Sequence, residues 1–337
     1  MKRIFLLIFT VFLFIPVWSQ SDPYTLIFSD EFDGTTLDLN KWTVQVGYAA
    51  NQEKEYYADG TNNLRVENGN LVITAKKELY VADRNYSSGR IYSKNKGYLT
   101  YGKIEARISV PSGAGTWPAF WMMPQSNTYG SWPKSGEIDI MEHIGSDPRM
   151  TSHAVHTALK NGSLGNNWFA KVYKDSMENK FHIYSIIWEK DQILFFVDNI
   201  KTATLYRNFT DTSTGWPFDQ NFYVILNLAI GGTMGGTVDD SIFNNPVEMK
   251  VDYVHLYQAT NTAVSVPTDS HIRVFPTKFS NEIHVSTDNP TEMKLYNSQG
   301  KQILQKIISD TEIIDTSNIP GGIYLLKTND YSTKLIK

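Results

Sequence analysis

The stretch Glu137-Ile138-Asp139-Ile140-Met141-Glu142 places three carboxylates within six residues of an otherwise apolar run. Side chains alternate between the two faces of a regular strand, so Glu137 and Asp139 share a face and Glu142 points away. A β-bulge adds one residue to a strand, and with Met141 as that residue Glu142 returns to the shared face. The two isoleucines then bury on the opposite face. The stretch therefore predicts a bulged strand that presents three acids together.

Two of these acids have a spacing that suits one kind of catalysis. Along a strand the backbones of Glu137 and Glu142 lie roughly 13 Å apart, at about 3.3 Å per step, and inclined side chains close much of that gap. Retaining glycosidases hold two carboxyl groups about 5–5.5 Å apart, so the stretch is compatible with that chemistry. A strand edge with solvated acids is the alternative interpretation, and the stretch alone does not decide between them.

The rest of the chain also has the pattern of short strands. Segments of alternating polar and apolar residues recur, separated by turn signals such as Asn68-Gly69 and Asp198-Asn199, without a convincing amphipathic helix. The pattern predicts an all-β sandwich over residues 22–258, an antiparallel jelly roll with a convex and a concave face. A concave groove lined by Trp and carboxylates suits a linear polymer, because such rings join an apolar body to a polar tip. Trp42 and Trp188 are expected in the core instead.

The two ends of the chain differ from its middle. Residues 1–20 have a short basic start followed by an apolar run, which predicts a secretory signal peptide. Residues 259–270 shift to Thr, Ser, Asn, Val and Pro without periodicity, which predicts a linker. Residues 271–337 read as a second, smaller β domain, and no carboxylate pair or His cluster in it suggests chemistry.

Composition excludes several classes of function. The net charge of −4 offers no basic field for nucleic acid or for an anionic membrane surface. The chain has no cysteine, so disulfides, thiolate catalysis and cysteine-based zinc sites are excluded. We expect a monomer, exported and stabilised by its core, that needs no cofactor for catalysis.

The acidic stretch and its surroundings resemble glycoside hydrolase family sixteen, in its laminarinase-like branch. That branch carries the pattern Glu-x-Asp-x-x-Glu, whereas the lichenase branch lacks the extra residue, here Met141. Further blocks follow in the family's order: Phe28–Phe32, Val66–Leu71, Ser88–Ile91, Gly115–Met122, Trp216–Gln220, Leu226–Gly232 and Val251–Val254. The resemblance covers about residues 24–258 and implies a concanavalin A-like β-jelly roll with a concave catalytic groove.

The resemblance implies separate roles for the three acids. Glu137 matches the nucleophile, Glu142 the general acid/base, and Asp139 the helper between them. The implied activity is that of a secreted, retaining endo-β-1,3-glucanase acting on laminarin-like polysaccharides. Hydrolysis of mixed-linkage glucan or of a red-algal galactan is an alternative within the family. A non-catalytic glucan-binding jelly roll is the alternative from another class, although it would require loss of the acids.

Substrate-binding positions follow from the same resemblance. The matching residues are Trp117, Trp121, Trp132, Arg90, Asn51 and His156. His153-x-x-His156 also has a spacing that metal sites use, but no nearby third ligand is evident. The family segment often reads Asn-Asn-Glu-x-Gln where this chain has Asn51-Gln52-Glu53-Lys54-Glu55. Glu55 in place of the family's glutamine leaves the hydrogen bonding there open.

A structural calcium site is the third implication of the resemblance. Glu31 and Asp252 match side-chain ligands on the convex face, completed by backbone carbonyls that include Gly69. Hard oxygen donors suit calcium, and an ion there would brace the two ends of the jelly roll. Two surface carboxylates without an ion are the alternative.

The tail resembles the C-terminal sorting domain of the type IX secretion system of Bacteroidetes. The residues that carry this resemblance are Val274–Pro276, Leu295–Gly300, Ile319–Tyr324 and Lys334–Lys337. It implies secretion machinery as a partner and transport to the cell surface or the medium. A small carbohydrate-binding domain is the alternative, which the absence of Trp from residues 271–337 disfavours.

Overall fold

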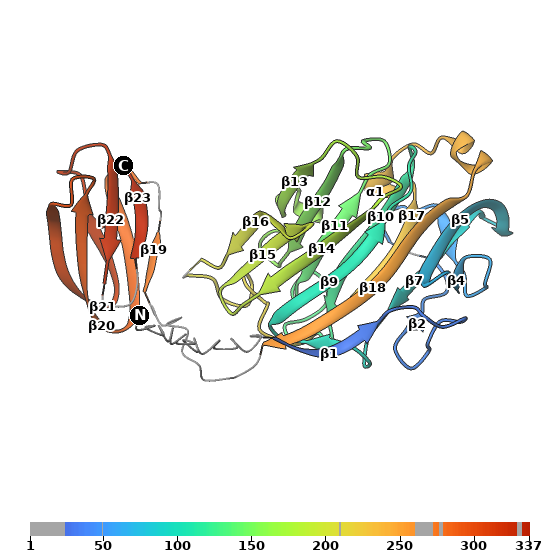
Figure 1. Ribbon diagram of the computed structural model, residues 1–337, viewed down its shortest axis with the longest axis horizontal. Helices are drawn as coiled ribbons and strands as arrows, with labels where there is room; N and C mark the ends of the chain where they lie inside the picture. Colours follow the sequence, from blue (N-terminus) through green and yellow to red (C-terminus); the bar gives the residue numbers. More distant parts are fainter. Residues whose placement is uncertain (1–23, 49, 209, 260–271, 276–278, 329–331) are drawn as a thin grey trace, which may run out of the picture. The chain divides into compact units, whose positions relative to one another are not determined.

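A computed structural model describes residues 24–337, apart from 49, 209, 260–271, 276–278 and 329–331 (Figure 1). The expected signal peptide at 1–20 and nearly all of the expected linker at 259–270 lie outside the described residues. The chain divides into two compact units, one within Met1–Thr260 and one within Asn261–Lys337. Among the described residues, no helix is long and apolar enough to cross a membrane.

Two antiparallel sheets build the first unit (Figure 1). Sheet A has ten strands in the order β16-β15-β14-β9-β18-β5-β6-β3, with β1 beside β18 and β4 beside β5. Its strands are β1 Tyr24–Asp30, β3 Glu55–Tyr57, β4 Leu64–Glu67, β5 Asn70–Val81, β6 Arg84–Ser88, β9 Gly102–Ser109, β14 Phe181–Trp188, β15 Gln192–Val197, β16 Ile200–Tyr206 and β18 Val247–Ala259. One pair departs from antiparallel order, because β3 runs parallel to β6.

Sheet B has eight strands in the order β13-β12-β11-β10-β17-β7-β2, with β8 beside β17. They are β2 Thr43–Val44, β7 Arg90–Tyr92, β8 Tyr98–Leu99, β10 Thr116–Pro124, β11 Glu137–His143, β12 Met150–His156, β13 Trp168–Tyr173 and β17 Phe222–Ile230. Three short helical turns complete the unit: η1 Gly162–Leu164, α1 Gly232–Gly235 and η2 Asp240–Asn244. The predicted all-β jelly roll is confirmed.

The core of the first unit lies between the two sheets. Alternation along β10 turns Phe120 and Met122 into the core, where both are fully buried. Trp42 and Trp188 are also fully buried, as predicted. The opposite face of β10 carries Trp117 and Trp121, whose ring nitrogens bond polar side chains of the same sheet. Sheet B therefore has one face that stabilises the fold and one face that is free for chemistry.

Both predicted turns are present, and their backbone explains the residue types. Asn68 and Gly69 have φ values of 52° and 71° between β4 and β5. Asp198 and Asn199 have φ values of 51° and 62° between β15 and β16. Two successive residues at positive φ are typical of the tight hairpin turns that match the twist of a sheet.

The predicted bulge in β11 is present. Against β10, Met141 pairs with Phe120 and Asp139 pairs with Trp121, so Ile140 is the residue without a partner. Against β12 the register also shifts between Asp139 and Glu142. The prediction that Met141 is the inserted residue is therefore wrong in the β10 register. The physical reason is that Ile140 and Met141 both bury in the core, so the neighbouring strands decide which of them is skipped.

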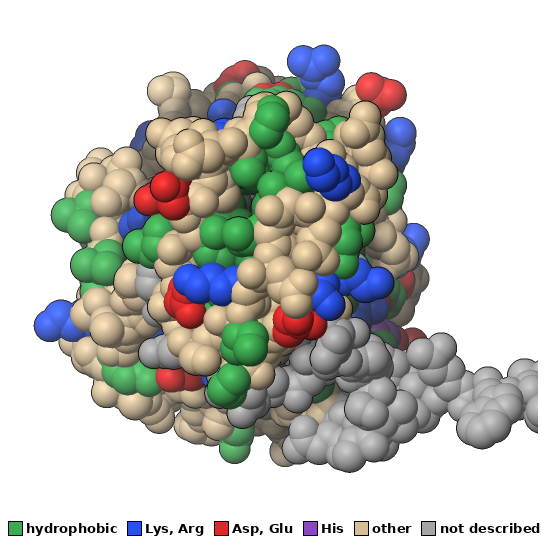
Figure 2. Space-filling view, turned by 90° about the vertical axis from the view of Figure 1, so that its left-hand side faces the viewer, with side chains coloured by type: hydrophobic (Ala, Val, Ile, Leu, Met, Phe, Trp, Pro, Cys, Tyr) green, Lys and Arg blue, Asp and Glu red, His purple; other side chains and the backbone are tan. Residues whose placement is uncertain are grey.

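The second unit is a separate five-stranded sheet with its own apolar core. Its strands are β19 Arg273–Phe275, β20 Glu282–Asn297, β21 Gln302–Asp315, β22 Ile323–Lys327 and β23 Ser332–Ile336. Along β22, Tyr324 and Leu326 are buried whereas Ile323 and Leu325 are exposed. Figure 2 shows one face of the molecule, on which hydrophobic side chains are dispersed among polar and charged ones.

Candidate active site

The bulge gathers three acids on the face of sheet B that is turned away from the core. Trp132, from the loop before β11, donates its indole N–H to Glu137 Oε2. Trp117, from β10, donates its indole N–H to Glu142 Oε1 at 3.0 Å. Each outer acid of the stretch is thus held by a tryptophan from a different segment. The structure brings Glu137, Asp139 and Glu142 together as the sequence predicted.

His156 completes the cluster from the neighbouring strand. It lies opposite Glu137 in the β11–β12 ladder, and its Nε2 is 3.2 Å from Asp139 Oδ2. The backbone N–H of Gly162 donates to His156 Nδ1 at 3.0 Å, so in the neutral ring Nε2 carries the hydrogen. His156 therefore lies against the middle acid, with Nε2 facing Asp139 Oδ2.

The alternative that His153 and His156 form a metal site is wrong. His153 is fully buried in the core, where its Nδ1 lies 2.6 Å from Ile140 O and its Nε2 2.8 Å from Thr202 Oγ1. Three positions apart on a strand, the two rings point to opposite faces. Ligand atoms of Glu137, Asp139 and His156 do come within 4.8 Å of one another. The β11–β12 pairing, which sets His156 opposite Glu137, brings these groups together.

Burial makes the acid cluster hold protons more tightly than free carboxyl groups do. Burial and the charge of Asp139 raise the pKa of Glu137 to about 8, against the opposing effects of His156 and Trp132. Burial and the charge of Glu142 raise the pKa of Asp139 well above its usual range. Burial raises the pKa of Glu142 to about 7, although the Trp117 N–H lowers it. The three groups titrate as a coupled set, and near neutral pH the cluster retains at least one proton.

Glu142→Gln should stabilise the folded protein at pH 8 and leave it nearly unchanged at pH 4.5. The pKa of Glu142 is raised from 4.5 to about 7 by folding, so the native state binds this proton more tightly than the unfolded chain. That contribution is present below the unfolded pKa and is lost as the pH rises through about 7. We expect a gain of about 1–3 kcal/mol at pH 8, measured by chemical denaturation. Glu67→Gln should show no such gain, because Arg65 lowers the pKa of this exposed carboxylate.

A second set of predicted residues lies beside the acids on the same face. The Arg90 guanidinium of β7 lies 4.7 Å from the ring centre of Trp121. The Trp121 indole N–H donates to Asn227 Oδ1 at 2.7 Å, and Asn227 Nδ2 donates to the Tyr57 hydroxyl at 3.1 Å. Asn227 and Tyr57 were not among the predicted site residues. One signal was available for Asn227, because it is the one polar residue within an apolar strand.

Asn51 lies at the edge of this face, in contact with the short helix α1. Asn51 is exposed and has a φ of 60°. Its backbone carbonyl accepts the N–H of Thr233 at 2.9 Å. Gly232 has φ +76°, and a Cβ there would lie 3.0 Å from Asn51 O and 3.2 Å from both Glu53 and Trp117. Only glycine fits this junction, which joins the Asn51 loop to the tryptophan that holds Glu142.

Residues 51–255 match the family described as glycosyl hydrolases family 16. The chain belongs to this family. Within the same chain, residues 273–337 match the family described as secretion system C-terminal sorting domain. Both resemblances expected from the sequence are therefore confirmed, and the acid cluster is the central feature of a family 16 domain.

Relatives of the family 16 domain carry consistent names. A β-glucanase of Rhodothermus marinus is 42% identical over 251 residues, which are 70% of this chain and 85% of the relative. Glucan endo-1,3-β-glucosidase A1 of Niallia circulans is 35% identical over 273 residues, which are 72% of this chain and 40% of the relative. The solved structure of the laminarinase from Rhodothermus marinus superposes with a TM-score of 0.67 at 40% identity, covering 70% of this chain and 98% of that one.

The expected calcium ligands of the family 16 domain have other partners in the structure. Glu31 Oε1 lies 2.6 Å from His255 Nε2, and Asp252 Oδ2 lies 2.6 Å from the Arg107 guanidinium. Gly69 lies in the turn between β4 and β5. His255 and Arg107 thus lie against the two carboxylates, and each carboxylate would have to leave this partner to bind an ion.

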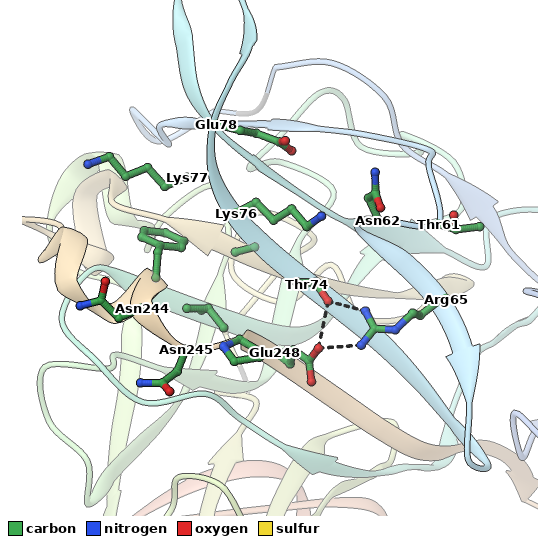
Figure 3. Close-up of a pocket in the computed structure, with 14 residues that line it drawn as sticks. Thr61, Asn62, Arg65, Thr74, Lys76, Lys77, Glu78, Asn244, Asn245 and Glu248 are labelled. Atoms are coloured by element: carbon green, nitrogen blue, oxygen red, sulfur yellow. Dashed lines mark hydrogen bonds and ion pairs between the residues drawn. The ribbon is translucent and has the colours of Figure 1, made fainter.

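A separate hollow lies on sheet A (Figure 3). It has a volume of about 590 Å³ and is lined by residues of β4, β5, η2 and β18. Arg65 crosses it to Glu248 and to Thr74 Oγ1, both at 2.6 Å. None of the acids or tryptophans of the family 16 cluster lines it, so it is not part of the candidate active site.

Proposed function

We propose that this protein is a secreted, retaining endo-β-glucanase that hydrolyses β-1,3 links in laminarin-like polysaccharides. The observation that carries the proposal is the bulged strand β11, which sets Glu137, Asp139 and Glu142 on one face under two tryptophan N–H groups. Membership of family 16 and relatives named β-glucanase, endo-1,3-β-glucosidase and laminarinase support the same assignment.

Hydrolysis proceeds in two displacements on this face. Glu137 attacks the anomeric carbon as a carboxylate, while Glu142 gives its proton to the departing glycosidic oxygen. A covalent glycosyl–enzyme ester remains on Glu137. Glu142, now ionised, takes a proton from water, and the hydroxide oxygen displaces Glu137 with a second inversion. The anomeric configuration is retained, and both acids return to their starting protonation states.

Asp139 and His156 lie beside the nucleophile Glu137 and influence its protonation between the two displacements. Because Asp139 and Glu137 are hydrogen bonded, a proton on Asp139 can be directed to Glu137 when Glu137 leaves the sugar as a carboxylate. His156 Nε2 lies 3.2 Å from Asp139 Oδ2, on the side of the neighbouring strand β12. The cluster retains at least one proton near neutral pH, and the first step requires that this proton sit on Glu142 while Glu137 is ionised.

The tryptophans divide into two kinds. Trp132 is 42% exposed and presents ring surface on which a sugar can stack. Trp117 is 8% exposed, so its main contribution is the hydrogen bond to Glu142. Trp121 is half-buried, with Arg90 beside its ring. Its ring would contact a second sugar of the glucan chain, next to the acids.

Reducing-sugar release from laminarin, lichenan and agarose tests the substrate assignment. We expect release to be largest from laminarin by at least about tenfold in kcat/KM, because one correctly placed sugar contact is worth about 1–2 kcal/mol. A preparation of Glu137→Gln purified in parallel controls for contaminating glucanases. Release from agarose alone would refute the β-1,3 assignment, and binding without release from any polysaccharide would indicate a glucan-binding protein instead.

The sorting domain assigns the chain to secretion, and we propose the complete route. A signal peptide at 1–20 brings the chain to the periplasm, and residues 271–337 direct type IX export to the surface or medium. Deleting 271–337 should leave the kcat/KM of the purified enzyme within about twofold and abolish export from the native host, assayed by immunoblot of medium and cells. Lost activity in the purified, folded truncation would favour a substrate-binding tail.

We propose that the enzyme acts as a monomer, because one chain supplies every residue of the acid cluster and its tryptophans. No cofactor enters the two displacements. Structural calcium remains a prediction. To bind the ion, Glu31 would have to leave His255 and Asp252 would have to leave Arg107.

A further inference from the structure

Two buried carboxyl groups lie outside the acid cluster, at the start of β3. Glu55 is fully buried, and its Oε2 accepts the backbone N–H of Ile230 at 2.7 Å. Glu53 is also buried, and its Oε2 accepts the Tyr57 hydroxyl at 2.9 Å. Backbone contacts join the same segment to the end of β17, from Lys54 N to Ile230 O at 2.9 Å and between Glu53 and Gly231. The pair therefore joins β3 to the strand that carries Asn227.

The two carboxyl groups need a shared proton. Glu53 and Glu55 form a side-chain hydrogen bond with each other, yet no donor reaches the buried Glu55 Oε1. Two ionised carboxylates buried side by side would repel each other, and one buried oxygen would stay unpaired. A proton on Glu55 Oε1, donated to Glu53, removes both costs at once.

The direction of the hydrogen bonds says which acid holds that proton. The Trp121 indole N–H donates to Asn227, Asn227 donates to Tyr57, and the Tyr57 hydroxyl donates to Glu53. Each group in this series gives a hydrogen to the next, and the series ends on Glu53 as an acceptor. The shared proton is therefore placed on Glu55, whose buried Oε1 has no other partner. The series starts at the indole that forms one side of the sugar-binding face.

We propose that Glu55 is a positioning residue, whose neutral carboxylic acid fixes Glu53 as the acceptor that holds Tyr57, Asn227 and Trp121 in place for the glucan chain. The proposal rests on the proposed function, because Trp121 is taken to bind sugar. An amide at position 55 would supply the same hydrogen at every pH. A carboxyl group supplies it only while protonated, so glucan binding becomes sensitive to alkaline pH.

The surroundings of the pair set the pH at which this change occurs. Burial, followed by the charge of Glu53, raises the pKa of Glu55 to about 8. The other titratable or charged side chains that face the pair are Tyr57 and Arg90, and, around the small hollow that Glu53 lines, Lys54, Asp83 and Arg84. Above this pH the pair carries two negative charges, and the contact between β3 and β17 weakens.

Glucan binding by full-length Glu137→Gln and by Glu137→Gln/Glu55→Gln tests the proposal without hydrolysis. Soluble laminarin is titrated calorimetrically at pH 6, 7, 8 and 9. Between pH 7 and 9 the single variant, which keeps Glu55, should lose about tenfold more affinity than the double variant, in which only the acid cluster still titrates. Glu189→Gln in the Glu137→Gln background is the control, because Glu189 is an exposed carboxylate at a turn. This control should follow the single variant.

Thermal unfolding of the same proteins separates this inference from the proposed function. Because folding raises the pKa of Glu55, its protonation stabilises the native state at low pH, and this contribution is lost as the pH rises through about 8. The melting temperature of the double variant should exceed that of the single variant increasingly from pH 6 to pH 9. Parallel melting and binding profiles for the two proteins would overturn the proposal. Absence of laminarin binding at every pH would refute the substrate assignment, while the melting profiles would still decide the role of Glu55.

Discussion

Glu137→Gln is expected to lower kcat/KM on laminarin by at least about 10⁴-fold, because it removes the nucleophile and leaves only binding and the acid. The amide keeps the shape of the carboxylate, and its oxygen can still accept the Trp132 N–H. Affinity for laminarin should therefore change by less than about threefold. Reducing-sugar assays under single-turnover conditions measure the first quantity, and calorimetry measures the second.

A buried carboxylate on the other sheet is the matched control. Glu105 lies in β9, where it accepts the Tyr253 hydroxyl and pairs with Lys103. Glu105→Gln should keep turnover on laminarin within about twofold, since sheet A carries none of the acid cluster. Unchanged turnover in Glu137→Gln would refute the nucleophile. So would a trapped glycosyl adduct on a peptide that lacks Glu137.

Glu142→Ala should lower kcat on laminarin by about 10³–10⁴-fold and should respond to azide. Without the acid, the glycosidic oxygen leaves unprotonated, but an aryl β-glucoside with an acidic phenol can still form the ester on Glu137. Azide then enters the space of the missing side chain and displaces Glu137, since it needs no base. Release of the phenol should rise at least about tenfold with azide, and the product should be a β-configured glycosyl azide.

The configuration of that product decides between mechanisms. Two inversions, one at Glu137 and one by azide, leave the β configuration. An α-configured azide would mean a single displacement and would contradict a retaining enzyme. No response to azide would contradict the assignment of Glu142 as acid/base. Glu178→Ala, in which a carboxylate beside His143 is removed, should gain nothing from azide.

The local pattern predicted the strands, the turns and the presence of the bulge, because these depend on neighbouring residues. It could not decide between Ile140 and Met141 as the skipped residue. Both are apolar and both bury, so the choice depends on the registers that β10 and β12 impose. The partner of Asp252 could not be predicted from local sequence either. Arg107 is 145 positions away and meets Asp252 only through the pairing of β9 with β18.

The sequence predicted which side chains belong to the site, but it did not predict how exposed each one is or which partner it bonds. The sequence placed Trp117, Trp121 and Trp132 together near the acids, as the structure does. Exposure then separates Trp132, which is 42% exposed, from the buried Trp117, although both indoles donate to an acid of the cluster. The hydrogen bond between Tyr57 and Asn227 joins residues 170 positions apart, so no local sequence pattern predicts it.

The bulge in β11 also bears on how such a strand can change in evolution. Loss of Ile140 or Met141 would leave Glu-x-Asp-x-Glu, in which regular alternation alone puts all three acids on one face. The mutation would remove one apolar side chain from the core while each acid stayed on its side of the sheet. A strand of this kind would keep its three acids on one face through the gain or loss of one residue. The length of the acidic stretch is therefore less constrained than the side of the sheet on which the acids lie.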